Sequence, residues 1–115
     1  GLDIGRGVLR AMVLGKMYGG IAQGVGMALT EDLMIEDGKF THMDLNHYKI
    51  PKARDLPDMT GIIIENPDPQ SPTKAKGIGE PALELIAPAI ANAVYNATGI
   101  RYRDLPIQVN PEELK

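Results

Sequence analysis

Small and apolar residues recur at helical spacing from Ala11 to about Asp32, which predicts a long helix. Many of these small residues are spaced four apart, and positions i and i+4 share one helix face. The pairs are Gly15 with Gly19, Gly20 with Gly24, and Ala22 with Gly26. Each interior glycine destabilises a helix by about 1 kcal/mol relative to alanine. Several together indicate that another backbone or a flat ligand packs very close to this helix.

A second helical pattern runs from Ala82 to Thr98. Its apolar stripe is expected to face the core and consists of Leu83, Ile86, Ala87, Ile90, Val94 and Ala97. Pro88 has no N–H to donate, so the helix should kink or split near residues 84–87. Gly99 then provides a typical helix end.

Short strands are predicted between and after the helices. Asp37-Gly38 supplies the positive φ angles of a tight hairpin turn within Ile35–Phe40. Ile62–Ile64 is β-branched and too short for a helix, so we expect a strand buried on both faces. Ile100–Ile107 alternates like a strand, and residues 110–115 suggest a final helical turn. The fold class expected is α+β, with two main helices packed on a small, mostly antiparallel sheet.

The turn at residues 74–81 carries the candidate chemistry. Gly77 and Gly79 flank Ile78, and glycine readily adopts positive φ and lets a ligand approach its backbone. Pro81 suits a first helical position, which places Glu80 at a helix N-terminus. Partial positive charge there favours an ionised carboxylate or a bound anion. Glu80 could therefore act as a general base or an orienting acceptor, although most strings of this kind simply begin a helix.

Composition and charge exclude several classes of function. The 115 residues allow one small domain, and 13 glycines with only 4% aromatic residues suggest a thin core. A net charge of −3 gives no excess of basic residues of the kind that binds nucleic acid. The absence of cysteine excludes disulfides and thiolate metal ligands. Lys16 and Gln23 interrupt an apolar run that is too short for a membrane span. His42 and His47 do not match a metal-ligand spacing, so no metal-binding side chains are predicted. The chain opens without Met or a leader, and we interpret it as a piece of a longer, cytoplasmic protein.

Four strings, in collinear order, resemble the C-terminal part of the molybdenum-binding subunit of the xanthine dehydrogenase/aldehyde oxidase family. They are Gly-Gly-Ile-Ala-Gln-Gly-Val-Gly at 19–26, Tyr-Lys-Ile-Pro at 48–51, Lys-Gly-Ile-Gly-Glu-Pro at 76–81 and Arg-Asp-Leu-Pro at 103–106. The resemblance covers nearly the whole chain. It implies that residues 1–115 are the C-terminal segment of a molybdopterin-binding domain, which other segments complete.

The resemblance also implies a reaction, the oxidative hydroxylation of a purine-like heterocycle or an aldehyde. Glu80 would be the catalytic residue, deprotonating a metal-bound hydroxyl or orienting the substrate. Gln23 would hydrogen-bond the molybdenum-molybdopterin cofactor, with a dinucleotide form left open, and Gly77, Ile78 and Gly79 would provide a close backbone approach. Iron–sulfur and FAD centres are expected on other domains or subunits. The partners implied are these, the remaining segments of the molybdenum subunit and a small-molecule substrate; a homo-oligomer is left open.

Two other hypotheses compete with this one. In the first, the chain is a non-catalytic interaction module that packs on a partner through its glycine-striped helix, and Glu80 only caps a helix. In the second, Gly77-Ile78-Gly79 binds a nucleotide, but these residues follow a proline-rich loop and lack the remaining glycine of the dinucleotide fingerprint. Arg101 and Arg103 could bind a phosphate, although an alternating pattern beside Asp104 is more typical of solvated charges.

Overall fold

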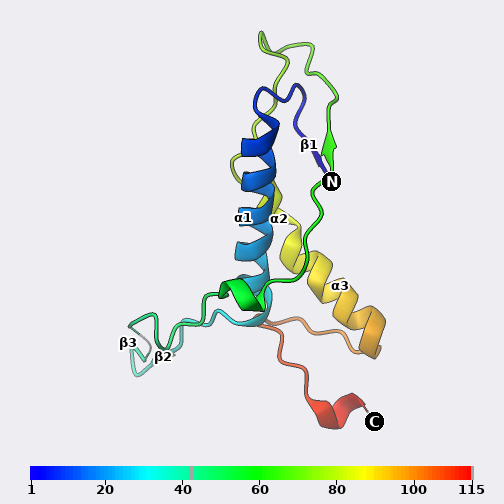
Figure 1. Cartoon of the computed structure of the whole chain (residues 1–115). Helices are drawn as coiled ribbons and strands as arrows, with labels where there is room; N and C mark the ends of the chain where they lie inside the picture. The colour runs from blue at the N-terminus through cyan, green and yellow to red at the C-terminus, as the bar shows by residue number, and fades with distance from the viewer. Residues whose placement is uncertain (42, 115) are drawn as a thin grey trace.

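The computed structural model describes residues 1–41 and 43–114, which form an elongated arrangement of helices, short strands and long connections (Figure 1). The elements in order are β1 (Leu2–Asp3), α1 (Arg10–Leu29), β2 (Ile35–Glu36), β3 (Lys39–Phe40), the 3₁₀ turn η1 (Ala53–Asp55), β4 (Ile63–Ile64), α2 (Pro81–Glu84), α3 (Ile86–Thr98) and the 3₁₀ turn η2 (Pro111–Leu114). The radius of gyration is 17.5 Å. A compact domain of this length has a radius of about 13 Å, so the chain is spread out.

Two glycines of α1 let the second helical region pack against it closely. A Cβ built on Gly20 would lie 2.8 Å from the Cβ of Ala82, and one built on Gly24 would lie 2.6 Å from Cγ2 of Ile86. The prediction that another backbone approaches this helix is therefore confirmed, and that backbone is α2 and the start of α3. Gly15 and Gly19 differ, because no described atom lies within 4 Å of a Cβ built on either.

The second helix is split, as the proline predicted. Leu85, with φ −100° and ψ 1°, separates α2 from α3. Gly99 closes α3 in the left-handed conformation with φ 74°, and its N–H donates to the carbonyl of Tyr95 at 2.7 Å. The apolar stripe is only partly covered: Ile86 packs on α1, but no α3 residue in the described chain is buried and Ala97 is exposed.

The expectation of one mostly antiparallel sheet was wrong. β1 and β4 form a parallel pair in which Leu2 faces Ile63, while β2 and β3 form a separate antiparallel hairpin. A parallel pair requires a long crossover connection, and the segment containing α1 supplies it. The hairpin was predicted correctly, with Asp37 and Gly38 at φ 49° and 74°.

Two strand predictions also need correction. Ile62 and Ile64 are 60% and 49% exposed, so the expectation of a strand buried on both faces was wrong. Among the described residues, β1 is the only strand that pairs with β4. Residues 100–107 form no strand in the part of the chain that the structure describes. Instead, the N–H of Ile107 donates to the carbonyl of Ala28 at 2.7 Å, and its side chain is buried at the end of α1. The final helical turn is present as η2.

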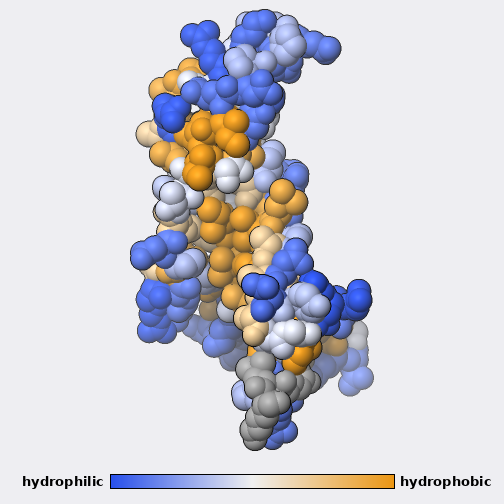
Figure 2. All heavy atoms as spheres, turned by 90° about the vertical axis from the view of Figure 1, so that its right-hand side faces the viewer, coloured by the Kyte–Doolittle hydropathy of each residue, from blue (hydrophilic) through white to orange (hydrophobic). Residues whose placement is uncertain are grey.

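The core is thin, as the composition suggested. Ile4, Val13 and Met17 form the main buried cluster, between β1 and α1. Large apolar side chains remain on the surface, with Leu85 72% exposed, and Figure 2 shows apolar residues running in a column over one face. Extended apolar surface of this kind marks sites of interaction. Within the described residues, no helix has the length and apolar character needed to cross a membrane.

Candidate functional site

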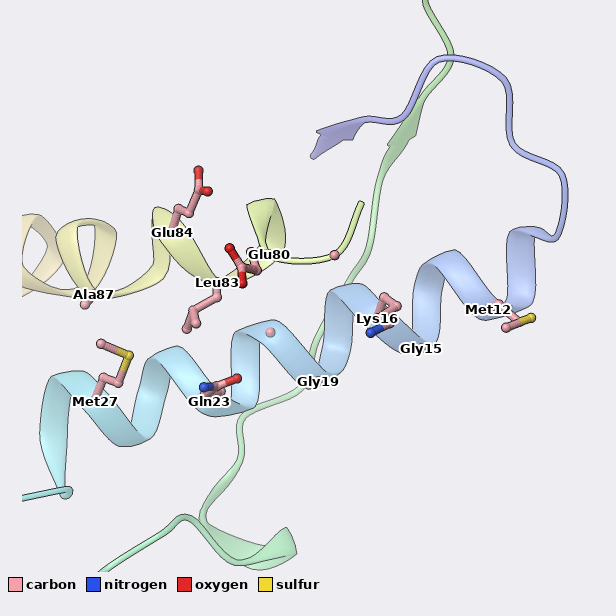
Figure 3. A pocket seen from close by; sticks show the side chains of 12 residues that line it. Met12, Gly15, Lys16, Gly19, Gln23, Met27, Glu80, Leu83, Glu84 and Ala87 are labelled. Carbon is pink, nitrogen blue, oxygen red and sulfur yellow. The ribbon is translucent and has the colours of Figure 1, made fainter. Parts of the chain in front are cut away.

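A groove of about 840 Å³ runs between α1 and the turn that leads into α2 (Figure 3). It is lined by Met12, Gly15, Lys16, Gly19, Gly20, Gln23, Met27, Gly79, Glu80, Leu83, Glu84 and Ala87. Three of the five predicted site residues, Gln23, Gly79 and Glu80, therefore meet in one place although they come from distant parts of the chain. The groove exists because Gly20 and Gly24 bring the two helical regions together.

Glu80 is at the position before α2, with φ −107° and ψ −22°, and Pro81 occupies the first helical turn as predicted. The side chain is exposed, and it makes no capping hydrogen bond. Among the described residues, no hydrogen-bond or ion-pair partner of its carboxylate is recorded. The carboxylate is thus available to a ligand in the groove, whereas α2, with four residues, is too short to form an anion site by its dipole alone.

The glycine turn differs from the prediction in one respect. Neither Gly77 nor Gly79 has positive φ; the described glycines that do are Gly5, Gly38 and Gly99. Gly77 and Gly79 instead leave open space beside the backbone, because no other part of the described chain lies within 4 Å of a Cβ built on either of them. Ile78 packs against the core cluster, so its side chain is structural. Gly77 and Ile78 are not among the residues that line the groove.

Two residues that the sequence analysis did not single out hold this turn against β1. Lys76 Nζ lies 2.6 Å from Oδ2 of Asp3, and Oδ1 of Asp3 accepts N–H groups from Gly5 at 3.1 Å and Asn66 at 3.3 Å. The hydrogen bond from Lys76, followed by that from Gly5, lowers the pKa of Asp3 to about 2. The two partners are 73 residues apart, so no local pattern could have revealed the pair.

Lys16 was also missed as a site residue. It is exposed on α1, lines the groove, and has no recorded ion-pair partner in residues 1–41 and 43–114. Figure 3 places it between Met12 and Gln23 along the helix. Because Lys16 and Gln23 are seven residues apart, they lie on the same face of the helix, and this spacing could have identified Lys16 from the sequence. The groove therefore has Lys16 on one wall and Glu80 and Glu84 on the other, and Figure 3 shows the side chain of Glu84 pointing away from α1.

Comparisons with known proteins identify the family of the chain. The profile of the molybdopterin cofactor-binding domain family matches residues 2–57. The aldehyde oxidoreductase molybdenum-binding subunit PaoC of Escherichia coli (strain K12) is 45% identical over 98 residues, which is 83% of this chain and 13% of that protein. The xanthine dehydrogenase molybdenum-binding subunit of Escherichia coli O157:H7 is 38% identical over 95 residues, 81% of this chain and 13% of that protein. The chain belongs to the xanthine dehydrogenase/aldehyde oxidoreductase family of molybdopterin-binding subunits.

The structural comparison supports the same family. The crystal structure of quinoline 2-oxidoreductase from Pseudomonas putida 86 matches with a TM-score of 0.84 and 31% sequence identity, covering 90% of this chain and 14% of that chain. The chain spans about 13% of the length of the curated relatives it matches. It is therefore homologous to a small part of a molybdenum-dependent oxidoreductase subunit. The family profile includes Gln23 on α1 but ends before Glu80.

The groove suits part of a molybdopterin. A pterin is a flat ring with hydrogen-bonding edges, and the open backbone at Gly15 and Gly19 leaves room for a flat group on one wall. The Gln23 amide beside it offers both a donor and an acceptor. In residues 1–41 and 43–114, no group of three or more His, Asp or Glu side chains could hold a metal directly. The Gln23 amide and the open backbone at Gly15 and Gly19 fit contacts to the organic part of the family's cofactor.

A further family string, at residues 48–51, lies outside the groove. The Tyr48–Pro51 loop docks on the C-terminal end of α1, where the Tyr48 hydroxyl donates to Oε2 of Glu31 at 2.7 Å. That hydrogen bond is the main cause of the raised pKa of Tyr48. Thr30 Oγ1 donates to the Lys49 carbonyl at 2.6 Å. This string is therefore a structural contact that holds the crossing loop.

The remaining candidates contribute to structure. Arg101 donates to Oδ1 of Asn92 at 2.8 Å and stacks 3.9 Å above the ring of Tyr95, so it is already engaged within the chain. Nδ1 of His47 lies 2.8 Å from Oδ1 of Asp44, and this contact is the main cause of the lowered pKa of Asp44. His42, the other half of the histidine pair considered above, lies outside the described residues.

Proposed function

We propose that this chain contributes the active-site glutamate of a molybdopterin-dependent hydroxylase that acts on an aldehyde or a purine-like heterocycle. We further propose that residues 1–115 are the C-terminal segment of its molybdopterin-binding domain. The observation that carries the proposal is the groove shared by Gln23, Gly79 and Glu80. The named activities of the relatives supply the substrate classes, with an aldehyde oxidoreductase subunit at 45% identity and a xanthine dehydrogenase subunit at 38%.

The bound cofactor would supply the redox centre of the reaction, and the protein supplies position and electrostatics. Glu80 is an exposed carboxylate on the groove wall, so it can accept a proton or a hydrogen bond from a group seated there. Gln23 would hydrogen-bond the pterin, whether or not the pterin carries a nucleotide. Gly77, Ile78 and Gly79 would offer their backbone. Other segments of the subunit would complete the pocket, and iron–sulfur and FAD centres would lie on other domains or subunits.

The test is Glu80→Gln in the complete subunit, assembled with its partner subunits. Glutamine keeps the shape of the side chain but cannot take up a proton, and loss of a general base lowers kcat by roughly 10²–10⁴-fold. The matched control is Glu84→Gln, because Glu84 lies on the same wall one helical turn away. We expect the control to keep normal turnover and both variants to keep their molybdenum. Normal turnover in Glu80→Gln would refute the catalytic role.

The interaction-module hypothesis is weakened by two features. Gly20 and Gly24 are already covered by α2 and α3 of the same chain, so this half of the glycine stripe is not open to a partner protein. Glu80 makes no capping hydrogen bond, which leaves it without the structural role that this hypothesis assigns. If the intact protein bound neither molybdenum nor pterin, the interaction-module hypothesis would be favoured over the hydroxylase function.

A further inference from the structure

We propose that the Asp3–Lys76 ion pair holds the turn that carries Glu80, so that both are positioning residues for the active-site carboxylate. The inference rests on the function proposed above for Glu80. Neither residue lines the groove, so any effect of either on turnover would be indirect. The argument has three parts: the backbone contacts of residues 74–76, the side-chain pair, and the unsupported glycines that follow.

The backbone of residues 74–76 is fastened to the segment after β1. The N–H of Arg6 donates to the carbonyl of Lys74 at 2.8 Å, and the N–H of Lys76 donates to the carbonyl of Ile4 at 2.9 Å. Gly5 and Ala75 form an isolated antiparallel bridge between them. Gly5 has φ 64°, and a Cβ there would press on the carbonyl of Lys74. The close approach therefore depends on a glycine at position 5.

The side chains of Asp3 and Lys76 add an ion pair to these backbone contacts, and we call this pair the clamp. Asp3 receives Lys76 on one carboxylate oxygen and the N–H groups of Gly5 and Asn66 on the other. A single carboxylate thereby joins β1, the loop after β4 and the turn. The side chains of Lys76 and Asp3 are 33% and 35% exposed, so water screens the pair only in part. The lowered pKa of Asp3 has these same contacts as its cause.

Beyond Lys76 the turn has little support of its own. No described atom lies within 4 Å of a Cβ built on Gly77 or Gly79, and only Ile78 packs on the core cluster between them. Glycine restrains the backbone less than any other residue. The position of Glu80 therefore depends on the ion pair at Lys76, on the packing of Ile78 and on the start of α2, where the N–H of Leu83 donates to the Glu80 carbonyl at 2.8 Å. Releasing the clamp should let the carboxylate move.

The experiment compares Lys76→Met with Arg10→Met in the complete subunit with its partners. Arg10 makes a 2.9 Å ion pair with Glu65, next to the same strand pair, but does not touch the turn. The readouts are hydrogen exchange of the peptide covering residues 74–80, molybdenum content, kcat and KM. We expect faster exchange in Lys76→Met, with kcat lower by about 10–100-fold because a misplacement of 1 Å can cost about 10²-fold. Molybdenum content and KM should stay as in the parent, Arg10→Met should leave all four unchanged, and Lys76→Arg should restore most of kcat.

The possible results separate the inference about the ion pair from the proposed role of Glu80. Unchanged exchange in Lys76→Met would overturn the inference, and so would faster exchange with normal kcat when Glu80→Gln is inactive. If Glu80→Gln itself stays active, the proposed function fails, and the exchange result alone decides whether the ion pair holds the turn. A fall in molybdenum content that parallels the fall in kcat would overturn the positioning role, because the clamp would then support the whole pocket.

Discussion

The glycines of α1 provide a prediction whose sign can be worked out position by position. Replacing an interior helical glycine with alanine stabilises a helix by about 1 kcal/mol when the new methyl group meets nothing. Gly19 meets that condition, since no described atom lies within 4 Å of a Cβ built there. Gly24 does not, because the new Cβ would lie 2.6 Å from Cγ2 and 3.1 Å from Cγ1 of Ile86. Overpacking of this kind costs about 1–3 kcal/mol.

The two effects combine differently at the two positions. Gly19→Ala should stabilise the protein by about 1 kcal/mol, whereas Gly24→Ala should be neutral to destabilising by about 2 kcal/mol after the helix gain is subtracted. The assay is thermal unfolding of the complete subunit without cofactor, with both variants measured beside the parent. We expect Gly24→Ala to melt below Gly19→Ala. Equal melting temperatures, or the reverse order, would refute the view that Ile86 of α3 packs directly on Gly24.

Two further predictions concern charge. The pKa of Asp3 is lowered from 3.8 to about 2 in the folded protein, so its contribution to stability is complete above about pH 4 and is lost as the pH falls toward 2. The protection of residues 74–80 against hydrogen exchange, taken relative to intrinsic exchange at the same pH, should therefore fall over that window in the parent and change less in Asp3→Asn; an equal fall in both would count against the clamp. Lys16→Met should raise KM for an aldehyde that carries a carboxylate by up to about fivefold and leave KM for a neutral aldehyde unchanged, because a partly screened charge pair contributes up to about 1 kcal/mol. Steady-state kinetics with the two aldehydes checks this, and equal effects on both would exclude a charge contact at Lys16.

Local chemistry made some elements predictable. Pro88 forced the break between α2 and α3, Gly99 ended α3, and Asp37-Gly38 closed the hairpin. In each case the decisive property belongs to one or two residues, either a missing N–H or a tolerance for positive φ. Gln23 was chosen by family resemblance and Glu80 by its glycine turn together with that resemblance, and both line one groove.

Long-range pairing was not predictable in the same way. The partner of Asp3 is 73 residues away, and nothing near either residue indicates the other. The parallel pairing of β1 with β4 is also set by the path of the chain rather than by the strands, which are only two residues long. Exposure of Ile62 and Ile64 was missed because an apolar run does not show which of its side chains other elements will cover.

The two sets of glycines on α1 explain why packing and site are coupled in this chain. Gly20 and Gly24 lie under α2 and α3, and their missing side chains bring the turn with Glu80 close to the helix. Gly15 and Gly19 stand on the neighbouring, open part of the same surface, which lines the groove. A larger residue at Gly20 or Gly24 would push Glu80 away from Gln23. A larger residue at Gly15 or Gly19 would fill space in the groove that a ligand would otherwise occupy. Substitutions in the first set should therefore change stability and turnover together, whereas those in the second should lower ligand binding while the fold stays intact.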